Sequence, residues 1–395
     1  MRHLVAGIVV LTLATPAPAA EPPLVEKYLH SGELARGEQA LEAALAASPK
    51  DDQLRFGLGV LRFVRGVERF GQFLHEYGAT ADKTDIPFLR LPVPRNPTPA
   101  PVTYHAFRRA FDDLIRDLAA AETTLAGVTD EKVKLPLRLA AVRLDLTGEG
   151  KPTDKFVDVL RRVTRQDFDF LKANPEFLVC FDRGDAAWLR AYCHLLMAMA
   201  DFYLAFDTEA LFDLTADRLF AWPKKPFRGT PEERSAKLSE AWKVVAVKEP
   251  ARLGRFRKHM LAVCALNRET WKFVLAETDD DHEWLPNPRQ TGVLGLPVRA
   301  EMVEAWLGLV GELEAALEGK KLIPVGLLWP NGGKGLNLRT LLDDPPERFD
   351  FDAIGKAGPA AKYLEQGQEV NLNVLFRLAN VFGDSLSVAY AAWFN

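Results

Sequence analysis

The chain has 395 residues, of which 48% are hydrophobic and 26% are charged, so it is long and apolar enough to fold around a substantial core. Lys and Arg number 50 against 54 Asp and Glu, a formal net charge of −4, which argues against a broad basic surface and hence against a nucleic-acid partner. A chain of this length typically forms two or three domains.

The first twenty residues have the three parts of a secretory signal. Arg2 and His3 form a basic start, an apolar run extends from Leu4 to Ala14, and small residues follow at 17–19. The apolar run is shorter than the roughly 20 residues that a membrane-spanning helix needs, which favours a cleaved leader over a permanent anchor. We therefore expect a signal peptide at 1–20 and a mature chain that is exported, to the periplasm or the extracellular space, without a stable membrane anchor.

The chain contains three cysteines, Cys180, Cys193 and Cys264, each in an apolar context. The odd number allows at most one internal disulfide in an oxidising compartment. Because free thiols are among the groups most often buried, three unpaired buried thiols are favoured over a bridge. No pair has Cys-x-x-Cys spacing, so a zinc ribbon or a thioredoxin-like site has no support.

Residues 32–77 have the spacing of two paired helices, separated by a break at 48–51. The segment Ala40-Leu41-x-x-Ala44-Leu45, followed by Leu58-Gly59, resembles a tetratricopeptide repeat. The segment departs from that family at positions where an aromatic or alanine residue is usual: Arg62, Gly71 and Gly78. The resemblance implies that helical surfaces bind a protein or a peptide.

The middle of the chain predicts a helical bundle. Six prolines between 86 and 101 favour an extended connector, so we expect a domain boundary there, between a helix-pair region at 21–85 and a central bundle at 102–278. Thr230-Pro231-Glu232-Glu233 forms a capping box that begins one helix. Helices are expected at 104–125, 131–146, 155–163, 185–206, 208–220, 231–247 and 253–275.

The region 279–395 predicts a loop, a helix and a small α+β part. The helix is expected to end at Gly319, and the apolar run at 322–329 predicts a buried strand before a turn. The segments 336–342, 360–364 and 370–382 fit either a strand or a short helix, and the aromatic tail 385–395 predicts a packed terminal strand or helix.

The densest cluster of charged side chains lies at 277–284. Its carboxylates and imidazole have the chemistry of ligands for a divalent cation, and the candidate metal ligands are Asp279, Asp281, His282 and Glu283. The segment lacks the central glycine and the final glutamate of an EF-hand loop, and a solvated loop at a helix end is the alternative interpretation.

His194 and Asp201 are seven positions apart in an apolar helix and therefore share a face. A hydrogen-bonded core pair is favoured over a functional acid–base pair. Residues 332–335 lack the Walker pattern and predict a hairpin turn, and the common hydrolase and dinucleotide-binding motifs are absent.

These patterns predict a mainly α fold: a helical-repeat-like N-terminal region, a central helical bundle and a small C-terminal α+β part. The function we expect is that of an exported non-catalytic scaffold, which binds a protein or a peptide through its helical surfaces. The alternative is an exported hydrolase or metal-dependent enzyme, with a site between the bundle and the C-terminal region. Beyond a divalent cation at the acidic loop, no cofactor is expected.

Overall fold

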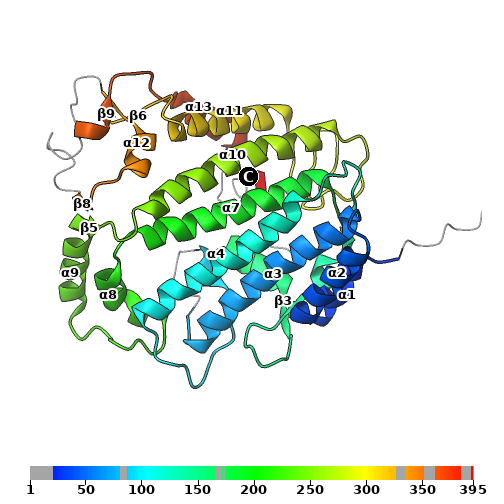
Figure 1. Ribbon diagram of the computed structural model, residues 1–395, viewed down its shortest axis with the longest axis horizontal. Coiled ribbons are helices and arrows are strands. Elements are labelled where there is room, and N and C mark those ends of the chain that lie inside the picture. Colours follow the sequence, from blue (N-terminus) through cyan, green and yellow to red (C-terminus); the bar gives the residue numbers. More distant parts are fainter. Residues whose placement is uncertain are drawn as a thin grey trace, which may run out of the picture.

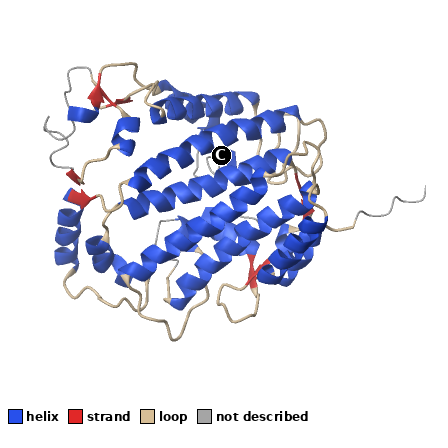
Figure 2. Cartoon of the chain, in the orientation of Figure 1, coloured by secondary structure: helices blue, strands red, loops and turns tan. Residues whose placement is uncertain are grey.

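The computed structural model describes residues 21–80, 87–164, 171, 174–325, 334–350, 361–383 and 393–394. The fold is mainly helical, with a small C-terminal α+β part, as predicted (Figure 1, Figure 2). The α-helices are α1 (Leu24–Ser31), α2 (Leu34–Ala47), α3 (Asp52–Glu76), α4 (Tyr104–Ala126), α5 (Phe156–Thr164), α7 (Arg183–Ala205), α8 (Glu209–Leu219), α9 (Pro231–Lys243), α10 (Ala251–Ala276), α11 (Ala300–Leu317), α12 (Leu338–Asp343) and α13 (Asn373–Phe382).

The strands are short, and every sheet that they form is antiparallel. One sheet pairs β1 (Leu135–Leu137) with β4 (Val179–Phe181), a second pairs β2 (Arg143–Leu144) with β3 (Asp154–Lys155), and a third pairs β5 (Val244–Ala246) with β8 (Arg348–Asp350). The fourth has the order β6 (Ile323–Pro324), β7 (Gly335–Leu336), β9 (Leu364–Glu365). Short 3-10 helices lie at η2 (Pro87–Arg90), η3 (Leu139–Ala141) and η4 (Ala361–Tyr363).

The long helices pack in a row. Helix α3 packs against α4, α4 against α7, and α7 against α10, and α11 then packs on α10 and α13 on α11. Figure 1 shows α3, α4, α7 and α10 side by side across the molecule. Each contributes an apolar stripe to one continuous core, in which Phe56, Leu118, Cys193, Trp271 and Phe394 are almost completely buried.

Side chains at the helix starts accept hydrogen bonds from backbone N–H groups that the helix leaves without partners. Asp51 accepts from Leu54 N at the start of α3, and Thr103 accepts from Ala106 N at the start of α4. The predicted capping box of Thr230 is confirmed at the start of α9, which ends at Lys243 rather than near 247 because the chain then enters β5. Asp182 forms a second capping box, at the start of α7.

The predicted helix pair at 32–77 is present as α2 and α3, and its apolar faces are covered by other helices. Leu41 and Leu61 are fully buried, and α1 and α4 pack against the pair. A methyl group added at Gly59 would lie 2.5 Å from Leu125 of α4, so glycine permits the close approach of α3 and α4. The core is continuous across the proline-rich connector, while the proposed division into domains stays a prediction.

The helix expected at 131–146 is wrong, because that segment forms β1, η3 and β2. Pro136 lacks the N–H that a helix interior requires, and it faces Cys180 in the antiparallel pairing of β1 with β4. Leu135 and Leu137 are buried with a period of two, the strand period. Pro136 therefore indicates the strand correctly, whereas the spacing of the leucines predicted a helix.

The structure distinguishes between strand and helix in the C-terminal segments that fitted either, where their residues are described. The segment 336–342 is mostly α12, 370–382 is mostly α13, and 361–363 is a 3-10 turn. Only the start of the apolar run at 322–329 is described, as strand β6, and the glycines at 332 and 333 lie outside the described residues. Of the C-terminal tail, Trp393 and Phe394 are described, and both are buried.

Residues 1–20 lie outside the described part of the chain, so the predicted leader stays a prediction. Across the described segments, none of the helices combines the length and the apolar character needed to span a bilayer.

Candidate functional site

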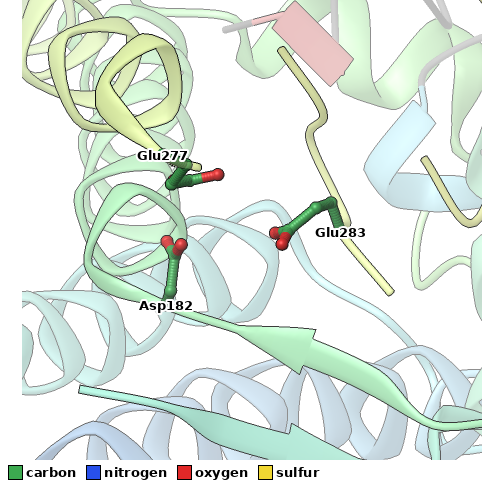
Figure 3. A group of neighbouring side chains, drawn as sticks. All are labelled: Asp182, Glu277 and Glu283. Atoms are coloured by element: carbon green, nitrogen blue, oxygen red, sulfur yellow. The ribbon is translucent and has the colours of Figure 1, made fainter. Parts of the chain in front are cut away.

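Three acidic side chains from separate segments converge at one end of α7 and α10 (Figure 3). Asp182 is the N-cap residue of α7, and Glu277 is the C-cap residue of α10. Glu283 lies in the loop after α10, where backbone hydrogen bonds hold it: Cys180 N donates to His282 O, and Val293 N donates to Glu283 O at 2.9 Å. We call Asp182, Glu277 and Glu283 the acidic triad.

The acidic triad is compact and buried. One carboxylate oxygen from each residue lies within 4.8 Å of the other two. Asp182 is 6% exposed and Glu283 is 1% exposed, while Glu277 is half-buried. A fourth carboxylate lies close by, because Asp185 is buried in the first turn of α7 and its Oδ2 accepts a hydrogen bond from Asp182 N at 3.1 Å. Figure 3 shows the carboxylates of the acidic triad pointing toward one another.

No basic side chain of the described residues forms an ion pair with these four carboxylates. Lys134 exerts an attractive charge on the triad, but its Nζ donates to Asp279 Oδ2 at 2.9 Å. Arg183, next to Asp182 in sequence, pairs with Glu269 and lies over the ring of Phe273. Buried carboxylates without a cationic partner are costly, so the site favours an additional positive charge.

The pKa values of the carboxyl groups reflect the same lack of positive charge. Burial and the charge of Asp182 raise the pKa of Glu283 to about 7, although Asp281 N–H and Lys134 oppose the rise. Burial, together with a hydrogen bond and charge repulsion from Asp182, raises the pKa of Glu277 to about 10. Burial and the charge of Asp182 also raise the pKa of Asp185 well above its usual value. At neutral pH the group therefore holds protons unless another cation replaces them.

The carboxylates in turn shift the pKa of Lys134. Burial lowers its pKa, but the hydrogen bond to Asp279 and the charges of Glu283 and Asp182 outweigh burial and raise the pKa above its usual value. The Lys134 ammonium group therefore stays charged at the edge of the site.

The acidic triad offers only oxygen ligands, which suit hard cations such as Ca²⁺. Ca²⁺ takes six to eight oxygens, so the triad would supply part of the shell, and carboxylates that coordinate in a bidentate manner, backbone carbonyls or water would supply the rest. Asp182 and Glu277 also share a side-chain hydrogen bond, which contributes to the raised pKa of Glu277.

Of the four metal ligands predicted from the sequence, the structure places only Glu283 in this cluster. Asp279 pairs with Lys134, and Asp281 accepts a weak hydrogen bond from Cys180 Sγ at 3.4 Å. His282 is half exposed, lies 3.7 Å from Asp281 and has a left-handed backbone with φ 63°. The four side chains do not converge.

The sequence analysis missed Asp182, and it included Glu277 in the charged cluster at 277–284 but not among the four candidate ligands. Asp182 has a signal in the sequence, since Asp182-Arg-Gly-Asp185 before an apolar run fits the pattern of a helix cap with an acidic residue three positions later. Glu277 lies one residue beyond the end of a helix and has no comparable signal.

The loop that carries Glu277 and Glu283 also forms the wall of an open pocket of about 320 Å³. The pocket is lined by an aromatic ring, an imidazole, a carboxylate and several small residues: Phe177, His282, Asp280, Thr291, Gly292, Val293 and Gly295. Thr291 N donates to Asp280 Oδ1 at 2.9 Å, and the rings of Phe177 and His282 meet edge to face. The same loop therefore has a buried acidic side and an accessible side.

Two further predictions concern His194, Asp201 and the cysteines. His194 and Asp201 lie on one side of α7, but each contacts His259 of α10, which lies between them. The three cysteines are free and buried, which confirms the favoured interpretation. Burial raises the pKa of Cys180 and of Cys264 to about 12, so these groups remain thiols at neutral pH.

Comparison with known proteins gave no match: no family model, no curated protein and no solved structure resembles the chain significantly.

Proposed function

We propose that the chain is an exported, non-catalytic binding protein whose loop at 277–295 is fastened to the helical body by a divalent cation of the calcium class. The observation that carries this proposal is the convergence of Asp182, Glu277 and Glu283 at a buried point, with no ion pair from any basic group of the described residues. The cation would join the start of α7, the end of α10 and the loop.

A cation explains the site better at neutral pH than protons do. Protonation of Glu277 satisfies the hydrogen bond with Asp182, but Glu283 has a pKa of about 7 and is half ionised there. A divalent cation compensates two negative charges and accepts oxygen ligands from all three segments at once. Because the triad contains neither thiolate nor imidazole, calcium or magnesium suits it better than zinc or copper.

A binding role follows from the position of the loop. Glu283 is adjacent to His282 and close in sequence to Asp280, and these two residues line the pocket. A cation that holds Glu283 in place would also fix the pocket wall and reduce the conformational entropy lost when a ligand binds. The apolar face of the repeat-like helix pair is covered by α1 and α4, so we assign contact with a protein or peptide partner to the pocket side of this loop.

A catalytic role for the same carboxylates has less support. Asp182 and Glu283 are 6% and 1% exposed, and the pocket is lined by Phe177 and by other residues of the loop. A general acid or base must come within hydrogen-bond distance of the substrate, which buried carboxylates of this kind do not allow without movement.

Calorimetric titration of calcium into the mature chain at pH 7.5 tests the proposal. We expect one calcium ion to bind per chain, and Glu283→Gln to weaken binding by at least about tenfold, because a coordinating charge is lost. Asp182→Asn should have the same effect, and asparagine still caps α7, so the helix start is kept.

The matched control is Asp281→Asn, a change of the same kind in the same loop. Asp281 points to Cys180 and lies outside the acidic triad, so its removal should leave calcium affinity within about twofold. Absence of calcium binding to the wild type, or equal losses in the Asp281 and Glu283 variants, would disprove the assignment of the site.

A further inference from the structure

A histidine pair joins α7 and α10 well away from the acidic triad. The Nδ1 atoms of His194 and His259 lie 2.8 Å apart, within hydrogen-bond distance. Their ring centroids are 5.1 Å apart, and their side chains are 18% and 19% exposed. The two helices form the most extensive helix pair of the core, so the bond lies in a principal packing interface.

Each ring also faces a carboxylate on its other side. Nε2 of His194 lies 3.6 Å from Glu122 Oε1 on α4, and Nε2 of His259 lies 3.7 Å from Asp201 Oδ2 on α7. These carboxylates are themselves paired with arginines: Glu122 with Arg190, and Asp201 with Arg252 and Arg255. The charged and titratable groups that face the pair are thus Glu122 from α4, Arg190 and Asp201 from α7, and Arg252 and Arg255 from α10.

Proton counting shows how the pair responds to pH. A hydrogen bond between two Nδ1 atoms needs one proton, because one ring donates and the other accepts. When the pair carries one positive charge, it has three N–H groups. One Nδ1–H lies between the rings, and one Nε2–H on each ring is directed toward a carboxylate. A second proton places an N–H on both Nδ1 atoms, so the bond is lost and two positive charges face each other at 2.8 Å.

We propose that the His194–His259 pair is a pH-sensitive latch, which holds α7 against α10 near neutral pH and releases their contact in mildly acidic surroundings. The direction of titration agrees with this geometry. Burial and the charge of His194 lower the pKa of His259, although Asp201 opposes the change. A lowered pKa of histidine means that the folded protein binds fewer protons than the unfolded chain, so this contribution to stability is lost as the pH falls below about 6.5.

His259→Asn tests the latch, because the asparagine amide takes the place of Nδ1 as a donor to His194 but does not titrate. We expect the unfolding equilibrium constant of the wild type to rise about tenfold more than that of the variant between pH 7.5 and pH 5, as measured by urea unfolding of the full mature chain. The protection factors of amides in α7 and α10, which relate each exchange rate to its intrinsic rate at the same pH, should fall over this interval in the wild type only.

The matched control is His105→Asn, since His105 is exposed on α4. It should keep the pH response of the wild type, whereas an unchanged response in His259→Asn would overturn the proposal. A second measurement does not depend on the variant folding: ring nitrogen NMR of the wild type. We expect one of the two rings to take up its proton well below pH 6.5, and ordinary titration of both rings near pH 6.5 would also overturn the latch.

Discussion

Lys134 Nζ donates to Asp279 Oδ2 at 2.9 Å, at the edge of the acidic triad. The charge of Lys134 lowers the pKa of Glu283. Within the described residues, however, its ammonium group forms an ion pair with Asp279 and not with Glu283. Lys134, which lowers the pKa of Glu283, is thus held by an exposed aspartate, and the buried carboxylates depend on protons or on a bound cation.

The first prediction concerns pH in the absence of divalent cations. The raised pKa values of Glu283, about 7, and Glu277, about 10, mean that the folded protein binds more protons than the unfolded chain above pH 5. The contribution of these two carboxyl groups to the free energy of unfolding therefore falls as pH rises from 5 to 8. Glu283→Gln should gain on the order of 2 kcal/mol relative to the wild type over this range.

Urea unfolding at several pH values in EDTA measures this difference. The comparison between the two proteins removes the effects of other titrating groups, such as Glu68, whose pKa burial raises to about 7, and His259. Parallel pH profiles of wild type and variant would show that Glu283 ionises normally in the folded protein.

Lys134→Met should change stability and calcium affinity in opposite directions. Without calcium, loss of the ammonium charge leaves the carboxylates less compensated, and we expect a destabilisation of about 1 kcal/mol at pH 8. With calcium, loss of a competing cation should increase affinity about threefold. Lys132→Met, at an exposed position two residues away, is the control. Reduced calcium affinity in Lys134→Met would contradict the account.

Gly59→Ala should destabilise the fold, because the added methyl group meets fully buried Leu125 at 2.5 Å. We expect a loss of about 1–3 kcal/mol, typical of overpacking in a core. Gly308→Ala on α11 is the matched substitution, since no heavy atom lies within 4 Å of its added methyl group. Helix propensity should make that variant up to about 1 kcal/mol more stable. Equal effects in denaturant unfolding would contradict the close approach of α3 and α4.

Asn267 on α10 should be essential for fixing the C-terminal tail. Its Nδ2 donates to Phe394 O at 2.7 Å, and its Oδ1 accepts from Trp306 Nε1 at 3.1 Å, at a position that is 1% exposed. Asn267→Leu leaves buried polar groups without this partner and should cost about 2–3 kcal/mol. Tryptophan fluorescence during urea unfolding measures the loss, and a change below about 0.5 kcal/mol would contradict it.

Helices with clear amphipathic periodicity were predictable from the sequence. The expected ranges for α4 and α10 lie within a few residues of the observed ones, and the capping box at Thr230 was located correctly. The segment around Pro136 was not, because its leucines fit a helical pattern loosely while the missing N–H of proline and the pairing with β4 favour a strand.

The candidate site was only partly predictable, for a different reason. Charge density drew attention to 277–284, but it does not reveal which side chains turn inward, and of the four candidate ligands only Glu283 does so. Asp182 and Glu277 reach it because α7 packs along α10, so that the N-cap of one helix lies beside the C-cap of the other. No local pattern in the sequence specifies that tertiary contact.

A crystal structure of the protein grown in calcium at neutral pH would show whether the acidic triad binds a cation. We expect an electron-density peak between Asp182, Glu277 and Glu283, with carboxylate oxygens about 2.3–2.6 Å from it, and a strong anomalous signal at the same place after exchange with terbium. Asp182 and Glu277 in direct hydrogen-bond contact, with no peak beside Glu283, would show instead that protons alone neutralise the acidic triad and would contradict the account.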